Sequence, residues 1–217
     1  MGGSNLKDRA RQMVKKLKRS NPEGGVELQH ANAFELLVAT ILSAQCTDER
    51  VNSVTPALFA RYTDPAALAQ ANSRELEKII HPTGFYRNKA QNLIRCSQRL
   101  VEAYNSQVPH TMEDLTTLPG IGRKTANVLL GACFQQPAIV VDTHVKRVAN
   151  RLALTTSLDP THIEYDLQAL LLPKDWTSGA QCLLLHGRYV CVARKPKCDQ
   201  CVIYQDCTWE DKQVVPC

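Results

Sequence analysis

The sequence has no long hydrophobic segment. Although 44% of the 217 residues are hydrophobic, no apolar run approaches the roughly 20 residues that a membrane-spanning helix needs. The first 20 residues carry seven lysines and arginines and no apolar h-region, so we expect no secretory signal peptide. These absences exclude an integral membrane protein and predict one that acts in the cytoplasm.

The alternation of apolar and polar residues that is typical of β-strands is nearly absent, whereas helical periodicity runs through the chain. We therefore predict an all-α fold of about ten short helices. The only strand-like run is Ala138–Val141, and because it is confined between Pro137 and Asp142 we expect a buried connector there. The predicted helices cover 6–17, 34–42, 51–62, two short segments starting at 64 and 73, 90–104, a short segment after 111, 123–134, 143–154, a segment after 161, and 177–190.

Capping residues mark several of these helix starts. Asn32-x-x-Glu35, Thr111-x-x-Asp114 and Thr161-x-x-Glu164 have the spacing of a capping box or a close variant. Pro56 lies inside the predicted 51–62 helix, so it must kink that helix or sit in its first turn.

Positive charge is concentrated in patches. The net charge is only +5, but residues 1–20, 79–101 and 186–198 carry seven, four and four Lys or Arg residues, against one acidic residue among all three segments. Separate basic patches favour a polyanionic partner, whereas each patch taken alone could also be a solvated helix face.

The segment 118–147 combines a tight loop, a lysine and a carboxylate. Pro119, Gly120 and Gly122 predict a turn directly before a helix, because glycine accepts positive φ without steric cost. The free amides at such a helix N-terminus suit a phosphate group. Lys124, in the first turn, would lie at the positive end of the helix dipole and be partly buried, which favours a neutral, nucleophilic amine. Asp142 follows eighteen residues later, where it can cap the next helix or present a carboxylate to a cleft.

Four of the nine cysteines fall within 17 residues near the C-terminus. Cys191, Cys198, Cys201 and Cys207 have the spacing C-x6-C-x2-C-x5-C, which suits either tetrahedral zinc or an iron–sulfur cluster. The first gap of this motif carries three cations, Arg194, Lys195 and Lys197, which could contact a nucleic acid backbone. We interpret the other cysteines, at 46, 96, 133, 182 and 217, as packing residues or free thiols.

Taken together, these motifs resemble the endonuclease III family of helix–hairpin–helix DNA glycosylase/AP lyases. The resemblance runs from about residue 28 to residue 207. It is carried by LSAQCTD at 42–48, TGFYRNKA at 83–90, LPGIGRKTANVLL at 118–130, VDTHVKRVANR at 141–151, HGRYVCVARKPKC at 186–198 and the four cysteines.

The resemblance implies a particular architecture and cofactor. A six-helix barrel with the helix–hairpin–helix would cover 26–136, and residues 1–25 with 137–217 would form a discontinuous iron–sulfur domain, with the DNA groove between the two. The cysteine quartet would hold a 4Fe–4S cluster. The partner would be double-stranded DNA with damaged bases or abasic sites, bound by a monomer in the cytoplasm at the nucleoid.

The resemblance also assigns roles to single residues. Lys124 would attack C1′ of the damaged nucleotide, form a Schiff base and lead to β-elimination, with Asp142 as the paired carboxylate. Gln45 would fill the gap left by the everted base and Phe85 would wedge the duplex. The remaining implied site residues are the hairpin residues Gly120, Gly122 and Arg123, the pocket residues Asp48 and His144, and the cationic loop residues Arg194, Lys195 and Lys197.

Other functions fit parts of the sequence. A helix–hairpin–helix can serve as a DNA clamp without catalysis, and a cluster alone could carry electrons, but neither accounts for Lys124 together with Asp142. Within the same scaffold, a glycosylase for mismatched or alkylated bases is the main alternative to one that removes oxidised pyrimidines. Cys46 and Phe85 stand where many bacterial relatives have a small residue and leucine, so the preferred lesion or opposite base could differ.

Overall fold

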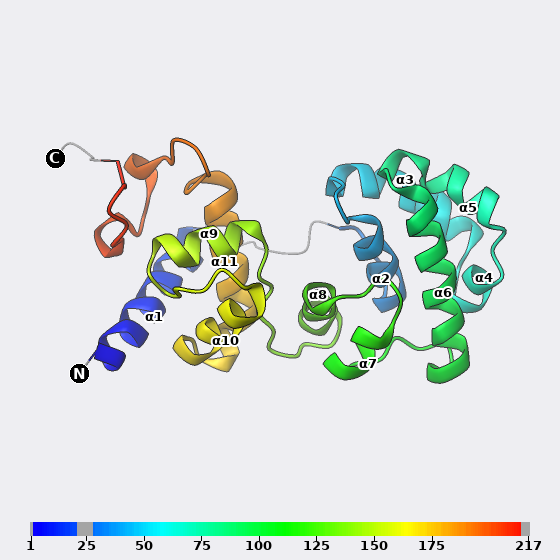
Figure 1. Cartoon of the computed structure of the whole chain (residues 1–217), viewed down its shortest axis with the longest axis horizontal. Coiled ribbons are helices and arrows are strands. Elements are labelled where there is room, and N and C mark those ends of the chain that lie inside the picture. The colour runs from blue at the N-terminus through cyan, green and yellow to red at the C-terminus, as the bar shows by residue number, and fades with distance from the viewer. Residues whose placement is uncertain (1, 21–27, 214–217) are drawn as a thin grey trace. The chain divides into compact units, whose positions relative to one another are not determined.

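The computed structural model describes residues 2–20 and 28–213 of the chain. Within these ranges it contains eleven α-helices, four 3-10 helices and no strand (Figure 1). The predicted all-α class is confirmed. Residues 138–141, the strand-like run, form the expected connector: Ala138 and Ile139 are buried, and the Ala138 amide donates to the Thr177 hydroxyl at 3.1 Å.

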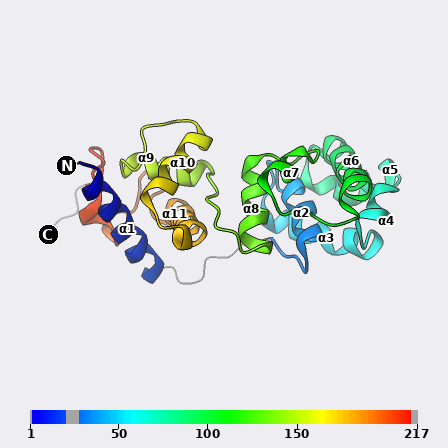
Figure 2. The same cartoon turned by 90° about the horizontal axis from the view of Figure 1, so that it is seen from below.

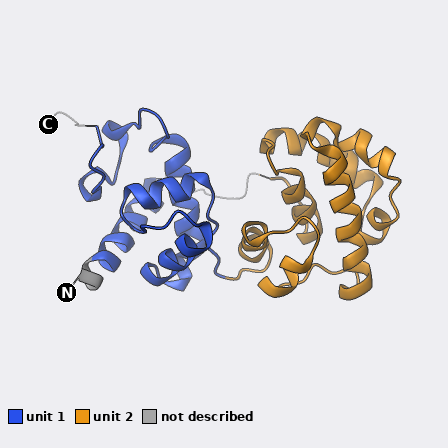
Figure 3. Cartoon of the chain, viewed as in Figure 1, with its two compact units in different colours: residues 1–25, 137–217 blue, residues 26–136 orange. Residues whose placement is uncertain are grey.

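The chain divides into two compact units, shown in blue and orange in Figure 3. Unit 1 joins residues 1–25 to residues 137–217, and unit 2 is the continuous segment 26–136.

Unit 2 is built around one long helix, α6, which spans Tyr86–Tyr104. The helices α4 and α5 pack against α6, and α2 packs against α3, α6 and α8 (Figures 1 and 2). Leu93, Cys96 and Leu100 give α6 a fully buried stripe, as the predicted helical periodicity requires. The other elements of unit 2 are α2 (Ala33–Leu42), α3 (Asp48–Arg61), α4 (Pro65–Ala69), α5 (Ser73–Ile80), η1 (His81–Thr83), α7 (Met112–Thr117) and α8 (Arg123–Cys133).

Unit 1 brings the first helix of the chain into contact with the C-terminal helices. Helix α1 buries Met13 and Leu17 in a core shared with α9, α10 and α11. Two ion pairs fix its polar side, Lys16 to Asp206 at 2.7 Å and Lys18 to Asp175 at 2.6 Å. The elements of unit 1 are α1 (Gly2–Ser20), α9 (Thr143–Arg151), α10 (Pro160–Leu170), η2 (Pro173–Asp175), α11 (Trp176–Tyr189), η3 (Cys198–Gln200) and η4 (Tyr204–Asp206).

Four predicted helices begin earlier than expected: α1 and α6 begin at Gly2 and Tyr86, four residues before the predicted 6 and 90, and the starts of α3 and α10 are set by upstream caps. Helix α3 begins at Asp48, where Thr47 accepts a hydrogen bond from the Arg50 amide, so Pro56 lies in the helix interior rather than in its first turn. Helix α10 is capped by Asp159, whose carboxylate accepts from two amides, and not by Thr161. In both cases a good N-cap residue stands upstream of the predicted start.

Candidate functional site

The helix–hairpin–helix consists of α7, the loop 118–122 and α8. Leu118 and Ile121 are buried, and the Ile121 amide donates to the Leu118 carbonyl at 3.1 Å, which closes the turn. Gly120 has φ +84°, and a Cβ at this position would lie 3.2 Å from the Cβ of Asn92 on α6. The hairpin is thereby seated on α6, and Gly120 is required both by its backbone conformation and by the close contact.

The backbone conformation of Gly122 contradicts the prediction that both glycines of the turn have positive φ. Its φ is −100°, which any residue adopts, and a Cβ would meet no atom within 4 Å. As the N-cap of α8, Gly122 provides no side-chain acceptor, and the first turn of α8 contains no acidic residue. The amides that open α8 therefore form a site suited to an anion.

Lys124 is the second residue of α8 and is exposed, not partly buried as predicted. The reason is its place on the helix: the buried side of α8 is formed by Ala126, Leu129 and Leu130, and helical spacing puts Lys124 on the opposite side. Lys124 thus stands in the first turn of α8, whose opening amides follow the hairpin. Arg123, beside it, is half-buried.

Gln45 and Phe85 lie at the tips of two loops and share an unusual backbone conformation. Gln45 has φ 54° in a turn closed by the Cys46 amide donating to the Ser43 carbonyl. Phe85 has φ 47° and is 65% exposed, which excludes a core role for this ring within the described structure. Positive φ is disfavoured for residues with a Cβ and is found more often at functional sites. Asp48, just after the first loop, is half-buried at the start of α3.

Lys89 connects these two loops. It is one of the four cations counted in the predicted basic patch at 79–101, but because it is buried it is not part of a surface patch. Its side chain is only 4% exposed, and its ammonium donates to the carbonyls of Leu42 and Thr83, both at 2.8 Å. The sequence does contain one indication that Lys89 is buried: it lies on the apolar face of the helix, between Tyr86 and Leu93.

In unit 1, Asp142 is the N-cap of α9. Its Oδ1 accepts from the Val145 amide at 2.8 Å, and the residue is half-buried. His144, two residues on, is also half-buried, and its Nδ1 lies 3.2 Å from a guanidinium nitrogen of Arg147. The alternative prediction for Asp142, a helix cap, is therefore confirmed, and one oxygen of the carboxylate is engaged in that cap.

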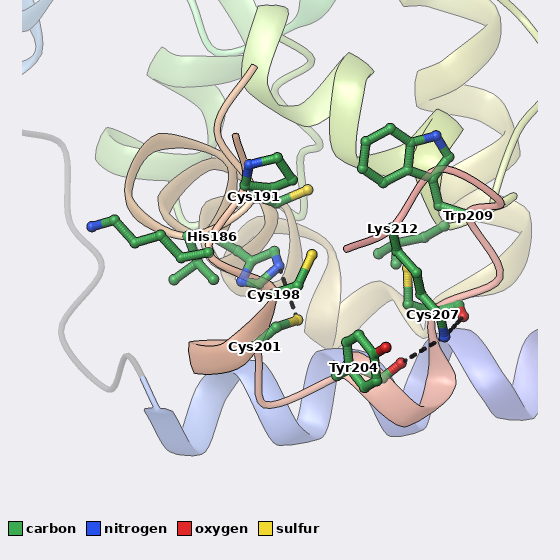
Figure 4. A pocket seen from close by; sticks show the side chains of 12 residues that line it. His186, Cys191, Cys198, Cys201, Tyr204, Cys207, Trp209 and Lys212 are labelled. Atoms are coloured by element: carbon green, nitrogen blue, oxygen red, sulfur yellow. Dashed lines mark hydrogen bonds between the residues drawn. The ribbon is translucent and has the colours of Figure 1, made fainter. Parts of the chain in front are cut away.

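The four C-terminal cysteines are brought together around one cavity (Figure 4). Among the described residues, no three His, Cys, Asp or Glu side chains are close enough to hold a single metal ion. The four thiolates of an iron–sulfur cluster bind different atoms of the cluster and need not meet at one point, so this finding is compatible with such a centre. Burial raises the pKa of Cys201 to about 11, and the neighbouring thiols add to this effect, so a Cys201 thiolate is stable there only beside a positive centre.

Cations and aromatic rings surround this cysteine cavity. Arg151 of α9 donates to the Cys191 sulfur at 3.3 Å and to the Val192 carbonyl at 2.9 Å, and it lies over the Trp209 ring. Lys212 donates to the Cys207 carbonyl at 2.9 Å. Hydrogen bonds to cluster sulfurs and loop carbonyls are what an iron–sulfur site needs from its surroundings. The donor set therefore fits a 4Fe–4S cluster.

Residues that hold this loop to its unit were missed by sequence reasoning. Arg147 donates to the carbonyls of Gly187 and Cys191, at 2.6 and 3.2 Å, and so ties α9 to α11 and to the loop. His186 is buried, and its Nε2 lies 3.7 Å from the Cys201 sulfur. Burial lowers the pKa of His186 to about 4, so the imidazole is neutral at pH 7. The motif VDTHVKRVANR contains Arg147 and also Arg151, which contacts the cysteine cavity. Only the contacts of these two arginines in the folded structure reveal their role.

The cationic loop between Cys191 and Cys198 is solvent-facing. Arg194, Lys195 and Lys197 are all exposed, and Lys195 has φ 55°. The Lys197 amide donates to the Val190 carbonyl at 2.9 Å, which closes the loop. Three exposed cations are thus presented from a loop that this hydrogen bond and the bonds from Arg151 hold in shape.

Comparison with known families defines the class of protein. Residues 38–173 match the HhH-GPD superfamily of base excision DNA repair proteins, and residues 191–207 match the iron–sulfur binding domain of endonuclease III. The chain is a helix–hairpin–helix protein of base excision repair with an iron–sulfur site. The described residues contain no helix long and apolar enough to span a membrane.

Individual relatives narrow this class. Endonuclease III of Synechocystis sp. is 50% identical over 93% of this chain and 92% of the relative, and that of Escherichia coli K12 is 38% identical over 93% and 95%. A solved trapped endonuclease III–DNA covalent intermediate superposes with a TM-score of 0.88 at 39% identity, covering 93% of this chain and 95% of that one. A thermostable thymine-DNA glycosylase shares the fold at 19% identity with a TM-score of 0.85, over 96% and 98% of the two chains.

The chain belongs to the endonuclease III family. It is a DNA N-glycosylase with AP lyase activity in base excision repair, its partner is DNA, and its cofactor is a 4Fe–4S cluster. The predicted family, fold class, activity and cofactor are confirmed.

Proposed function

We propose that the protein removes oxidised pyrimidines from duplex DNA and nicks the resulting abasic site through a Schiff base on Lys124. The observation that carries this proposal is an exposed lysine in the first turn of α8, beside helix-opening amides that no side chain caps. A relative that is 39% identical has been trapped as a covalent intermediate with DNA. We further propose that the protein acts as a monomer on chromosomal DNA in the cytoplasm.

The proposed reaction begins with attack of the Lys124 amine on C1′. A bond forms between Nζ and C1′ while the glycosidic bond breaks, and the base departs with a proton. Loss of a proton from the amine and opening of the sugar ring give an imine. Removal of a proton from C2′ then expels the 3′ phosphate, which nicks the strand, and water releases the lysine.

Asp142 is the carboxylate in this proposal. Its Oδ1 is fixed by the cap of α9, which leaves Oδ2 to stabilise positive charge developing on the sugar and to assist proton transfer at the amine. A carboxylate whose rotamer is set by a helix cap is held in place before substrate arrives.

The DNA-binding residues act before the chemistry. A stacked base cannot reach an enzymatic nucleophile, so the nucleotide must be everted. The hairpin amides, with Gly120, Gly122 and Arg123, would bind a backbone phosphate. Phe85 would wedge the duplex and Gln45 would fill the vacated space, a role for which both side chains are exposed at loop tips. Asp48 and His144 would line the pocket for the everted nucleotide.

The cysteine site supports binding rather than the covalent steps. Cys191, Cys198, Cys201 and Cys207 would hold the cluster, which when bound cross-links the loop and fixes its shape. Arg194, Lys195 and Lys197 would then bind a second stretch of DNA backbone.

A panel of duplexes, each with one defined lesion, tests the substrate class. Base release should be fast for oxidised pyrimidines such as thymine glycol and slow for alkylated purines and for undamaged mismatches. Preference for a mismatch or an alkylated base, with Lys124 still required, would replace the proposed substrate but keep the reaction. Release of no base at all would leave a DNA-binding role and refute the proposal.

A further inference from the structure

Lys89 is a charged side chain buried in the core of unit 2. It lies in the first turns of α6 and is 4% exposed. A buried ammonium is tolerated only where hydrogen-bond acceptors replace its water. Lys89 has two such acceptors, the carbonyls of Leu42 and Thr83, each at 2.8 Å.

Both acceptors lie at the ends of short helices, directly before the loop tips. Leu42 is the last residue of α2, three residues before Gln45, and Thr83 is the last residue of η1, two residues before Phe85. Carbonyls at a helix end lack intrahelical partners and carry the negative end of the helix dipole, so an ammonium is favoured there. One side chain thus joins two loops whose anchor residues are 41 positions apart.

The Lys89 backbone strengthens the second connection. Its amide donates to the Phe85 carbonyl at 3.1 Å, in the first turn of α6. Phe85 and Gln45 both hold positive φ, at 47° and 54°. Such conformations persist only where surrounding contacts determine them. Lys89 provides contacts of this kind to both loops at once.

Burial also affects the Lys89 amine itself. It lowers the pKa of Lys89, while the neighbouring Cys46 thiol raises it. Cys46 directly follows Gln45, so the electrostatic effect of Cys46 on the ammonium comes from the first loop itself.

We propose that Lys89 is a positioning residue for nucleotide eversion, which sets the spacing of the Gln45 and Phe85 loops so that both enter the duplex together. This inference rests on the proposed roles of Gln45 and Phe85. Lys89 touches neither DNA nor the reacting atoms. Its influence should therefore fall on the step that unstacks a base and not on the Schiff-base chemistry.

The decisive variant is Lys89→Met, which keeps an unbranched apolar stem and removes the donors. Lys89→Gln, which keeps one donor, serves if the methionine variant does not fold. Leu100→Val is the matched control, because Leu100 is fully buried on the same helix about three turns away. The melting temperature of each variant, measured by circular dichroism, separates general destabilisation from a local effect.

Two substrates distinguish the affected step. For a paired thymine glycol, base release by the Lys89 variants should fall on the order of ten- to a hundredfold in kcat, since small misplacements have effects of this size. The fluorescence rise of 2-aminopurine beside the lesion should slow in parallel. Nicking of a preformed abasic site, which has no base to evert, should fall less than about threefold. Leu100→Val should change neither rate beyond its effect on the folded fraction.

Other outcomes are equally informative. Equal loss on both substrates, or a loss matched by Leu100→Val at the same melting temperature, would reduce Lys89 to a structural residue and overturn the inference. Gln45→Ala and Phe85→Ala test separately the proposed roles of these two residues, on which the inference rests. If neither substitution slows the 2-aminopurine signal, the proposed roles of the two loops are wrong. If both do and the Lys89 variants do not, only the positioning role fails.

Discussion

Asp142 has two tasks at the scale of a single residue, and substitution can separate them. Asparagine caps helices about as well as aspartate, whereas alanine at an N-cap costs about 1 kcal/mol. We expect Asp142→Asn to leave the free energy of unfolding within a few tenths of a kcal/mol and Asp142→Ala to lower it. Both variants should lose most base release, because both lack the charge. Urea denaturation and a base-release assay measure the two effects.

An asparagine variant that is fully active would contradict the proposed role of Asp142. The carboxylate would then be a helix cap and nothing more.

Gln45 should show a conflict between stability and activity. Its φ of 54° is disfavoured for a side chain with a Cβ, by roughly 1 kcal/mol. We expect Gln45→Gly to raise the free energy of unfolding by up to about 1 kcal/mol and to slow base release, because the filler side chain is lost. Asn105→Gly is the control, because Asn105 also has positive φ, 50°, at the end of α6. This substitution should relieve a similar backbone conformation without affecting activity. Faster base release by Gln45→Gly would contradict the filler role.

Single residues differ in how far the sequence reveals them. Lys124 and Asp142 could be selected as candidates because each stands at a helix start with a distinctive local motif. Lys89, Arg147 and Arg151 could not, because each has a partner carbonyl or sulfur 40 to 47 residues away. Nothing in the local sequence of α6 says that Leu42 will lie against Lys89.

The hairpin offers a matched pair of glycines at the scale of the element. Gly120→Ala should destabilise unit 2 by about 1 kcal/mol or more, because Gly120 has φ +84° and its Cβ would crowd Asn92. Gly122→Ala should cost less, because its φ is ordinary and its surroundings are open, which leaves only the poorer N-capping by alanine, about 1 kcal/mol or less. Binding of abasic-site DNA should nevertheless weaken for Gly122→Ala, because the added methyl stands at the anion site. Unchanged DNA affinity would mean that the α8 amides do not bind phosphate.

Helix positions were predictable wherever the cap and the apolar stripe agree. Asn32 accepts from the Glu35 amide at 3.0 Å, and the Glu35 carboxylate accepts from the Ala31 amide, one residue earlier than in the capping box predicted there. Asp64 caps α4 ahead of Pro65 as expected. Asp159 stands before Pro160 in the same way and caps α10 ahead of the predicted Thr161, and Thr47, inside the motif LSAQCTD, caps α3.

At the scale of the whole molecule, the all-α class follows from periodicity alone, but the assembly of unit 1 does not. Helix α1 forms two ion pairs with later parts of the chain. Lys16 pairs with Asp206 and Lys18 with Asp175, and the partners are 190 and 157 residues apart in the sequence. Local patterns do not encode such pairings. Gly187 illustrates the same point, since a Cβ there would lie 2.9 Å from the His144 Cβ, and only the packed α9 and α11 show why glycine is needed.

Salt dependence tests the cationic loop. Charge reversal at Arg194 or Lys195 should weaken DNA binding on all sequences and reduce the slope of log affinity against log salt by about 1 per lost phosphate contact. Fluorescence anisotropy at several salt concentrations provides the measurement. Lys174→Glu, at an exposed lysine of η2 outside the loop, controls for net charge. A slope that changes equally in the control, or in no variant, would show that the loop makes no specific phosphate contact.

The most direct measurement is borohydride reduction during incubation with abasic-site DNA, followed by mapping of the cross-linked peptide. The wild type should form a covalent adduct whose DNA is attached at Lys124. Lys124→Ala should form none while retaining most of its DNA affinity, and Lys174→Ala should behave as the wild type. An adduct that persists in Lys124→Ala, or that maps to another amine, would contradict the account.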